Sequence, residues 1–369
     1  MTNPIARIAI VTGGGDAPGL NAVIRAVVLA SSGRGWECWG IRDGFNGLLA
    51  PQDCLDEPVT RLTPERVAGI GHLGGTILGS TSRGNPLCYP VAGGGGAQDR
   101  SDELLALFRR HRFDALVMAG GDSSMDIAAC LQRKGLPVVG VPKTIDNDLD
   151  GTIQTFGFDT AVGFATECID RLHTTADSQH RVMVVEVMGR YAGWIALHAG
   201  IAGGAHAILL PEIPFDIDPV AAAIARRDAL GRRHALVVAV EGAQPCGGTR
   251  RLLAQGGAGH AERLGGVGAW VEAQLAERSG KECRRVVLGH LLRGGAPSAV
   301  DRVVAARFGV AAVAALARGE AGVMVALSGE GVSTVPLHEV AGRSRRVPLD
   351  GDTLTTARAL GICLGEPAP

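Results

Sequence analysis

The chain has 369 residues, and 46% of them are hydrophobic, which is enough to build the cores of two lobes of ordinary size. Its formal net charge of −1 gives no electrostatic reason to expect nucleic acid or an anionic membrane as a partner, so any phosphate binding must come from local charge clusters. The eight cysteines are scattered without a Cys-x-x-Cys pair, the N-terminus has no apolar signal segment, and no apolar run is long enough to span a bilayer. We therefore expect a cytoplasmic protein with reduced thiols.

The first predicted unit is a strand, a glycine loop and a helix. The β-branched run 7–12 breaks into Gly13-Gly14-Gly15, and residues 18–30 are compatible with a helix. Such a loop lets backbone N–H groups approach a phosphate closely, and the N-terminus of the next helix adds a favourable dipole. The loop has neither the P-loop pattern nor the G-x-G-x-x-G spacing, so on its own it is equally consistent with a structural turn.

Further elements lead to a second loop of the same kind. We expect a strand at 36–41 and a helix that begins at Thr63, with Thr63 as its cap and a proline in its first turn. A helix at 101–111 and a strand at 115–118 then precede the loop 120–124, which reads Gly-Gly-Asp-Ser-Ser. An aspartate at this place can bind a metal ion together with phosphates, or it can cap the following helix.

The central segment of the chain carries the most chemistry. The apolar run 136–141 predicts a buried parallel strand that Pro142 ends, so the residues after it lie in the loop where α/β sheets bind ligands. That loop contains a cation, a hydroxyl group and two carboxylates, which belong to Lys143, Thr144, Asp146 and Asp148. A carboxylate can take a proton from an attacking hydroxyl, while a lysine and a bound metal offset the charge on a transferring phosphoryl group. A turn with a solvated charge cluster is the alternative.

Strands and helices continue to alternate in the second half of the chain. The expected helices lie at 159–175 and 299–318, and the expected strands at 182–187, 235–240, 285–288 and 323–327. Residues 343–369 are polar and carry no signal for an element. The alternation predicts an α/β fold made of two doubly wound three-layer α/β/α lobes, with an active cleft between them.

Five segments of the chain resemble the signature segments of the 6-phosphofructokinase family, in the same order and at similar spacing. They cover most of residues 7–310 and read Gly13-Gly-Gly-Asp-Ala-Pro-Gly-Leu-Asn21, Gly120-Gly-Asp122, Val139-Gly-Val-Pro-Lys-Thr-Ile-Asp-Asn-Asp148, Met188-Gly-Arg190 and Leu288-Gly-His-Leu-Leu-Arg-Gly-Gly295. The resemblance implies two discontinuous domains. Residues 1–157 and about 292–342 would bind the donor and the metal, and residues 158–291 and about 343–369 would bind the sugar phosphate.

The resemblance also implies an activity, namely phosphorylation of fructose 6-phosphate at its 1-hydroxyl in glycolysis by a phosphotransferase that acts on an alcohol group. Asp146 would be the general base, and Mg²⁺ on Asp122 and Asp148 would bridge the donor. Lys143, Thr144 and Arg190 complete the implied catalytic set. The donor phosphates are expected at Gly14, Gly15, Arg83, Gly121, Asp122, Ser123 and Ser124. The sugar phosphate is expected at Thr144, Asp146, Arg181, Met188, Gly189, Arg190, Glu241, Arg284, His290 and Arg293.

Several of these cationic residues flank predicted strands. Arg181 and Arg190 flank the strand 182–187, and we expect both at one anion-binding edge. Arg284, His290 and Arg293 surround the strand 285–288, and we expect them to converge on the 6-phosphate, because arginine offers forked donors and histidine can donate to phosphate oxygens. In the family, the counterparts of Arg181 and Arg284 reach across a subunit interface, which implies a homodimer or homotetramer with shared active sites.

The phosphoryl donor is ATP or pyrophosphate. The pyrophosphate-using branch of the family typically has Asp at the position of Ser123 and Lys at the position of Lys143, whereas the common bacterial ATP enzymes have Gly at both. The Ser-Lys pair of this chain departs from both patterns. A small neutral residue at 123 leaves room for the rest of a nucleotide, so we predict ATP and keep pyrophosphate as the alternative.

Two other functions are weighed against this reading. A non-catalytic sugar-phosphate sensor built on the same fold is expected to lose the base or a metal ligand, yet Asp122, Asp146 and Asp148 are all present. A lipid kinase can share the Gly-Gly-Asp loop, but it is not expected to carry the two sugar-phosphate segments, and a lipid substrate needs an apolar groove.

Overall fold

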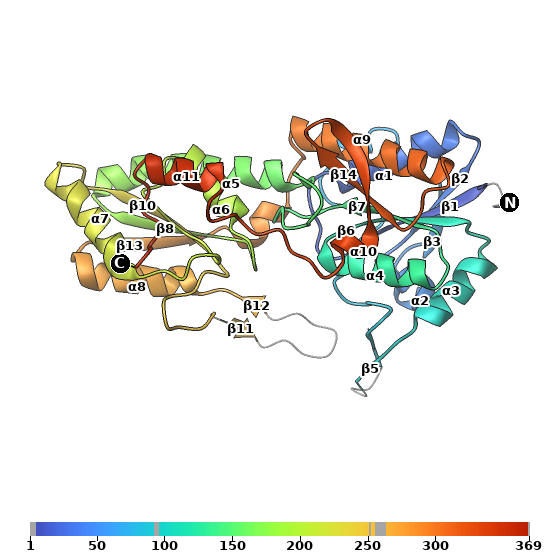
Figure 1. Cartoon of the computed structure of the whole chain (residues 1–369), viewed down its shortest axis with the longest axis horizontal. Helices are drawn as coiled ribbons and strands as arrows, with labels where there is room; N and C mark the ends of the chain where they lie inside the picture. The colour runs from blue at the N-terminus through green and yellow to red at the C-terminus, as the bar shows by residue number, and fades with distance from the viewer. Residues whose placement is uncertain (1–4, 92–95, 251, 255–262, 368–369) are drawn as a thin grey trace.

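The computed structural model describes residues 5–91, 96–250, 252–254 and 263–367. The remaining residues, which fall within the ranges of both expected domains, lie outside this description. Figure 1 shows two lobes, each built around its own sheet. Within the described part of the chain, no helix combines the length and the apolar character needed to cross a membrane.

The first lobe contains a seven-stranded sheet in the order β15-β14-β7-β6-β1-β2-β3. Its strands are β1 (Arg7–Thr12), β2 (Glu37–Ile41), β3 (Val59–Leu62), β6 (Ala115–Gly120), β7 (Val138–Pro142), β14 (Val323–Ser328) and β15 (Gly331–Pro336). The five inner strands are parallel, and β3 and β15 run antiparallel at the two edges. Strand β1 lies between β2 and β6, so the sheet grows in opposite directions from this point. The loops after β1 and β6 therefore lie at a topological switch point, where α/β sheets bind ligands.

Helices cover both faces of this sheet, and the alternation of side chains along β1 shows how. Ile8 and Ile10 belong to a core shared with α1 (Leu20–Ser32) and α9 (Ala299–Ala317), whereas Ala9 and Val11 belong to the core on the opposite face. The helices of that second face are α2 (Asn46–Leu49), α3 (Ser101–Arg110), α4 (Asp122–Arg133) and α10 (Leu337–Val340).

The second lobe has a four-stranded parallel sheet in the order β13-β8-β10-β9. Its strands are β8 (Val182–Val187), β9 (Ala207–Leu209), β10 (Ala235–Val240) and β13 (Cys283–Val287). Its helices are α5 (Phe158–Gln179), α6 (Trp194–Ala202), α7 (Ile217–Ala229), α8 (Val267–Ser279) and α11 (Asp352–Ala359).

The short elements of the molecule are η1 (Pro51–Asp53), η2 (Ile70–His72), η3 (Gly289–Arg293) and the pairs β4 (Tyr89–Pro90) with β5 (Ala97–Gln98) and β11 (Leu252–Ala254) with β12 (Arg263–Leu264).

The predicted α/β fold class is confirmed, and most predicted elements are found within a few residues of their expected bounds. The helix expected from Thr63 is wrong, because residues 63–69 form turns that lead into η2. Gly69 adopts a φ of 76°, which is incompatible with a right-handed helix, and the segment before it is too short to form a stable helix alone. The region 343–369, which carries no sequence signal, contains the helix α11.

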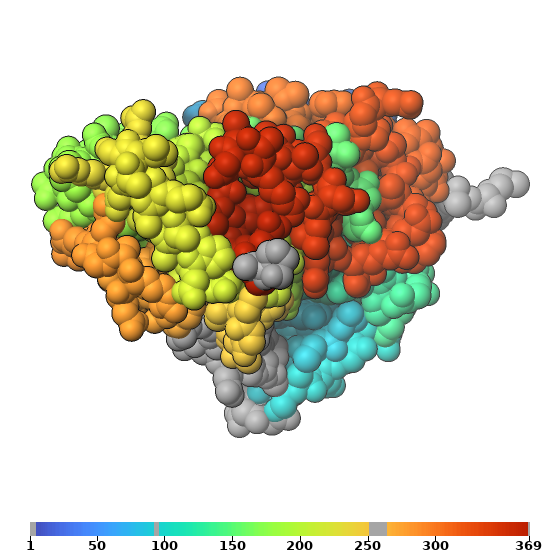
Figure 2. All heavy atoms as spheres, turned by 60° about the vertical axis from the view of Figure 1, so that its left-hand side comes forward, coloured from blue at the N-terminus to red at the C-terminus, as the bar shows by residue number. Residues whose placement is uncertain are grey.

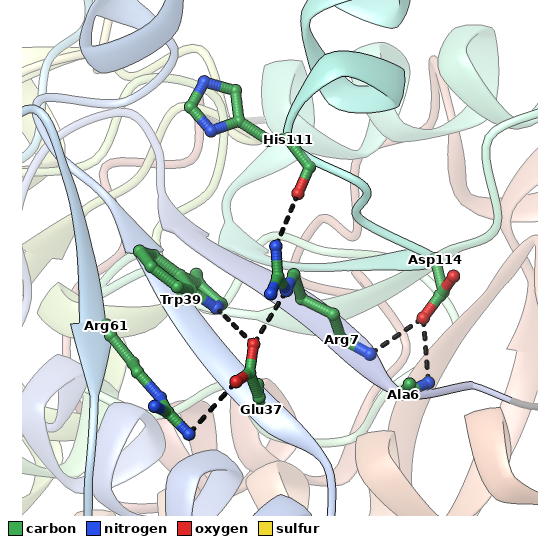
Figure 3. Close-up of polar contacts among 7 residues, drawn as sticks. All are labelled: Ala6, Arg7, Glu37, Trp39, Arg61, His111 and Asp114. Carbon is green, nitrogen blue, oxygen red and sulfur yellow. Dashed lines mark hydrogen bonds and ion pairs between the residues drawn. The ribbon is translucent and has the colours of Figure 1, made fainter.

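Charged residues pair with one another at the amino end of the first sheet, the end away from the loops described above (Figure 3). Glu37 on β2 accepts hydrogen bonds from Arg7 Nε at 2.8 Å and Trp39 Nε1 at 3.2 Å, and it pairs with Arg61 at 3.1 Å. The Trp39 hydrogen bond, followed by the Arg7 and Arg61 charges, lowers the pKa of Glu37. The charged side chains at this end of the sheet are therefore paired with one another, and the predicted loops lie at the opposite, carboxyl end.

Candidate active site

The loop after β7 is buried and held in place by its own hydrogen bonds. Lys143, Thr144 and Asp148 are only 3%, 7% and 9% exposed. The Thr155 hydroxyl donates to the Thr144 carbonyl at 2.6 Å, and the Thr155 N–H donates to Asn147 Oδ1 at 3.0 Å. Asn147 has a φ of 53°, a left-handed conformation that asparagine tolerates better than most residues. The chemical groups of this loop therefore have fixed positions.

Two cations from distant parts of the chain contact the glycine loop after β1. Lys143 Nζ donates to the Gly15 carbonyl at 2.6 Å, and Arg293 Nη1 donates to the Asp16 carbonyl at 3.1 Å. A Cβ atom on Gly15 would lie only 2.8 Å from Arg293 Nη1, and Gly14 has a φ of 76°. A side chain at position 15 would force the end of the Arg293 side chain to shift, and the positive φ at position 14 favours glycine there.

Carboxylates and cations share this buried site and shift one another's pKa. Burial raises the pKa of Asp146, and the charges of Arg293 and Lys143 oppose that shift. Burial, followed by repulsion from Asp146 and Asp122, raises the pKa of Asp148 to about 7. Burial and then Arg293 lower the pKa of Lys143 to about 8. Perturbed titration of this kind is typical of catalytic sites.

The carboxylates fit a divalent cation. Asp122 is exposed at the start of α4 and its charge reaches Asp146 and Asp148, while Oδ1 of Asp146 is buried with no hydrogen-bond partner among the described residues. A cation would relieve this repulsion. In the described part of the chain, no three His, Cys, Asp or Glu side chains form a complete metal cage. A divalent cation can also bind through one or two carboxylates and complete its shell with phosphate and water.

The second sheet contributes Glu241 and Arg190 to the same site. Glu241 follows β10, and its N–H donates to the Val187 carbonyl at 2.9 Å. Burial, followed by the charge of Asp146, raises the pKa of Glu241 to about 7. Arg190 lowers the pKa of both Asp146 and Glu241, so it lies within electrostatic range of each. The carboxyl ends of the two sheets therefore face the same site.

Met188 and Gly189 lead the chain into this site. Met188 is half buried and packs against the core of the second lobe. Gly189 has a φ of 146°, and a Cβ there would lie 2.6 Å from both the Ala192 carbonyl and Val240 Cγ1. Only glycine fits at this position, and the turn that it allows carries Arg190 toward the carboxylates.

The predicted donor residues surround the glycine loop. The Gly14 N–H donates to the Thr81 carbonyl at 3.1 Å, which places the segment before Arg83 beside the loop, and Arg83 itself is exposed. Ser123 is also exposed, and its N–H donates to Asp122 Oδ1 at 2.7 Å. Ser124 differs from the others because it is 4% exposed and its hydroxyl packs against Gly13 and Gly120. A Cβ on Gly121 would touch the Lys143 carbonyl at 3.5 Å, so this glycine lies beside the loop after β7.

Arg181 and Arg284 do not join this cluster within one chain. Arg181 precedes β8 and Arg284 lies at the start of β13, so both are at the amino end of the second sheet. Both form ion pairs with Glu282, and the distance from Arg181 Nε to Glu282 Oε2 is 2.7 Å. The expectation that they converge with Arg190, or with His290 and Arg293, on one strand end is therefore wrong for a single chain. A strand of six residues separates its two ends by about 20 Å. Exposed His290 and half-buried Arg293 do follow β13 in η3.

Arg250 is a further cation beside the site, and the sequence did not predict it. The Arg250 guanidinium lies 4.8 Å from the ring centroid of Tyr191, and Arg190 lies 5.9 Å from the same ring. Tyr191 directly follows the Met188–Arg190 segment and was therefore a usable signal. Arg250 lies far along the chain after a glycine pair and carries no signal of its own.

Comparison with known proteins gives a consistent family assignment. Residues 7–316 match the family model described as phosphofructokinase. The ATP-dependent 6-phosphofructokinase of Chloroflexus aurantiacus is 50% identical over 375 aligned residues, which cover 99% of each chain. The pyrophosphate–fructose 6-phosphate 1-phosphotransferase of Amycolatopsis mediterranei is also 50% identical, over 93% of this chain and 97% of that protein. The ATP-dependent 6-phosphofructokinase 1 of Synechocystis is 46% identical, over 98% of this chain and 99% of that protein.

Solved structures agree with this assignment. The T-state crystal structure of Pichia pastoris phosphofructokinase matches 97% of this chain with a TM-score of 0.79 and 29% identity, and this chain spans 36% of the Pichia chain. The pyrophosphate-dependent phosphofructokinase of Marinobacter aquaeolei, at 23% identity, has the same fold, with a TM-score of 0.77 over 99% of this chain and 93% of that one. By family model, sequence identity and fold, this chain belongs to the phosphofructokinase family.

Proposed function

We propose that this protein is a 6-phosphofructokinase that transfers the terminal phosphoryl group of ATP to the 1-hydroxyl of fructose 6-phosphate and yields fructose 1,6-bisphosphate. The observation that carries the proposal is the half-buried Asp146, on which the charges of Arg293, Lys143 and Arg190 all act to favour the anion. Relatives at 45–50% identity that are named ATP-dependent 6-phosphofructokinase support this reaction, whereas relatives at 49–50% identity that are named pyrophosphate–fructose 6-phosphate 1-phosphotransferase support the alternative donor. Because the reaction belongs to glycolysis, we place the protein in the cytoplasm.

We propose a part in the reaction for each residue. Asp146 accepts the proton of the 1-hydroxyl as the oxygen attacks the phosphorus. Lys143, Thr144 and Arg190 bind the oxygens of the transferring group as the bond to the donor breaks. Glu241 binds hydroxyl groups of the sugar, and Met188, Gly189, His290 and Arg293 line its binding site.

The donor and its metal ion bind mainly to the first lobe. We propose that Asp122 and Asp148 hold Mg²⁺, which neutralises charge on the donor phosphates when it is bound. The donor phosphates lie along Gly14, Gly15, Gly121 and the 123–124 turn, with Arg83 across them. We assign residues 1–157 and about 292–342 to this function, and residues 158–291 and about 343–369 to the sugar phosphate.

A coupled assay tests the proposed function. Purified protein, fructose 6-phosphate and Mg²⁺ are incubated once with ATP and once with pyrophosphate, and fructose 1,6-bisphosphate is measured. We expect product with ATP. Product with pyrophosphate alone would establish the alternative donor, and no product with either donor from folded protein would refute the proposed function.

Ser123 is expected to decide between the two donors. Its side chain is small, neutral and exposed at the start of α4, which leaves space for a nucleotide beyond the reacting phosphates. We expect Ser123→Asp to lower kcat/KM for ATP by about tenfold or more, because it places a second carboxylate next to Asp122, near the position of the α-phosphate. The control is Ser123→Ala, which should change kcat/KM for ATP by less than about threefold. Equal losses with ATP and pyrophosphate would show that Ser123 is not at the donor site.

We propose further that the active protein is a homodimer or homotetramer. Strand β13 is an edge strand, and Val287 on it and Leu291 in η3 are 52% and 63% exposed. Helix α9 exposes three more valines, Val300, Val303 and Val310. Exposed apolar side chains next to an unpaired strand edge support association with a second copy. In such an assembly, Arg181 and Arg284 would bind the sugar phosphate in the partner's active site.

Subunit mixing tests the shared site. Arg284→Ala and Asp146→Asn subunits, each nearly inactive alone, are combined under conditions that exchange subunits. In a mixed dimer, one site contains both intact residues, so about a quarter of all sites should recover activity. As a control, Asp146→Asn mixed with Asp148→Asn should recover none, because these residues belong to the same chain's site. Confirmed exchange without recovery in the first mixture would contradict the shared site.

A further inference from the structure

The last passage of the chain between the lobes runs beside the catalytic loop. It is the red segment that connects α10 to α11 in Figure 1, and in Figure 2 it lies at the surface beside a green patch from the segment around residue 150. Leu149 and Ser344 form an antiparallel bridge, and the Arg345 N–H donates to the Asp148 carbonyl at 2.8 Å. The backbone of this passage is thus paired with the end of the loop that holds Asp146 and Asp148.

The side chain of Arg345 binds the same loop at two further points. Its Nη1 donates to the Ile153 carbonyl at 2.8 Å and lies 3.5 Å from the Asn147 carbonyl. Asn147 is the residue with the left-handed φ of 53°, and it directly precedes Asp148. Arg345 therefore contacts the loop at its bend and again where the loop ends.

Arg345 is also fixed to the second lobe, through Trp194. The indole Nε1 donates to the Arg345 carbonyl at 3.0 Å, and the guanidinium carbon lies 4.3 Å from the ring centroid. Trp194 is 6% exposed and is the first residue of α6, four residues after Arg190. One arginine thus joins the segment that follows Arg190 to the loop that carries Asp146.

We propose that Arg345 is a positioning residue for the reaction: it holds the bend of the catalytic loop against α6 and so aligns Asp146 and Asp148 with Arg190 across the two lobes. The planar guanidinium suits this task, because it can donate to carbonyl oxygens at its edge while it stacks on the indole with its face. A lysine could keep its charge over the indole ring, but its single ammonium group lacks the planar set of donors that a guanidinium offers. The kinetic part of the proposal rests on the proposed function.

A purely structural anchor for the C-terminal segment is the competing explanation, and Val347 provides a matched control for it. Val347 is 3% exposed, and its N–H donates to Glu212 Oε1 at 2.9 Å. No hydrogen bond joins it to the loop 143–148 in the described structure. Val347→Ala should therefore loosen the segment without changing the loop. Arg343, which is exposed in the same segment, serves as the charge control.

The experiment measures kcat and KM for fructose 6-phosphate together with amide hydrogen exchange in residues 144–155. We expect Arg345→Met to lower kcat about tenfold or more, since small misplacements of catalytic groups are costly, with KM within about threefold of wild type. Amides of residues 144–155 should exchange faster in this variant. Arg345→Lys should recover part of the lost kcat. Val347→Ala should lower Tm but keep kcat within about twofold, and Arg343→Ala should change neither.

A double-mutant cycle with Trp194→Phe tests the link to the second lobe. If Trp194 acts through Arg345, adding Trp194→Phe to Arg345→Met should cost less than about twofold further in kcat, whereas independent action would give additive losses. If Arg345→Met fails to fold, the Lys variant carries the test. The proposal is overturned if the substitution at 345 leaves kcat within twofold of wild type, or if Val347→Ala loses as much. If wild-type protein is inactive with both donors, the proposed function fails. The positioning role is then tested by amide exchange alone, and it is overturned if residues 144–155 exchange at the same rate in Arg345→Met as in wild type.

Discussion

Asp146→Asn is expected to lower turnover at least about 100-fold while fructose 6-phosphate still binds, because the substitution removes a positioned base and keeps its shape. In the structure, Asp146 is the carboxylate on which the charges of Arg293, Lys143 and Arg190 all act, and its Oδ1 has no hydrogen-bond partner among the described residues. An asparagine there cannot accept the proton of the 1-hydroxyl. Steady-state kinetics and a titration with fructose 6-phosphate would measure the two quantities.

The same substitution should not destabilise the protein. Burial raises the pKa of Asp146, which means that the fold disfavours the charged form, and a neutral amide removes that cost. Asp170→Asn is the control, since Asp170 is exposed on α5 and the variant should keep turnover within about twofold of wild type. Turnover of Asp146→Asn within threefold of wild type would exclude Asp146 as the base.

The sequence predicted the position of the loop after β7 for a physical reason. Buried parallel strands read as continuous apolar runs, so the end of β7 and the exit of Lys143 to Asp148 into a ligand-binding loop could be placed directly. The same rule, applied to strand direction, could have placed Arg181 and Arg284 correctly. A residue before a parallel strand lies at the opposite edge from a residue after it, and both arginines belong to the amino end.

The contacts of Arg345 and Arg250 could not be predicted in this way. Arg345 binds the carbonyls of residues 198 and 192 positions earlier in the chain, and it lies in an irregular segment without helical or strand periodicity. Arg250 reaches Tyr191 from a stretch that forms no element. Such contacts depend on how the lobes pack. A turn segment such as 63–69, which was wrongly expected to be a helix, similarly depends on one glycine conformation.

Asp148→Asn is expected to make the metal-free protein more stable above neutral pH than the wild type. The pKa of Asp148 in the folded protein is raised from its ordinary value of 3.8 to about 7, so folded wild type holds its proton more tightly than unfolded chain does. Stability from this proton is fully present below about pH 4 and is lost as the pH rises through 7. Asparagine does not titrate, so the advantage of the variant should grow by about 2 kcal/mol between pH 5 and pH 7.5.

Urea denaturation in chelator at the two pH values would measure this difference, and Asp170→Asn again serves as the control. Mg²⁺ with the donor should reverse the order, because wild type gains stability by binding the ion through Asp148 and the variant loses that ligand. Turnover of Asp148→Asn should fall about 100-fold for the same reason. Identical pH dependence of unfolding in wild type and variant would show that Asp148 is not buried as a charged group. Equal stabilisation of both proteins by Mg²⁺ and donor would show instead that the ion is held without it.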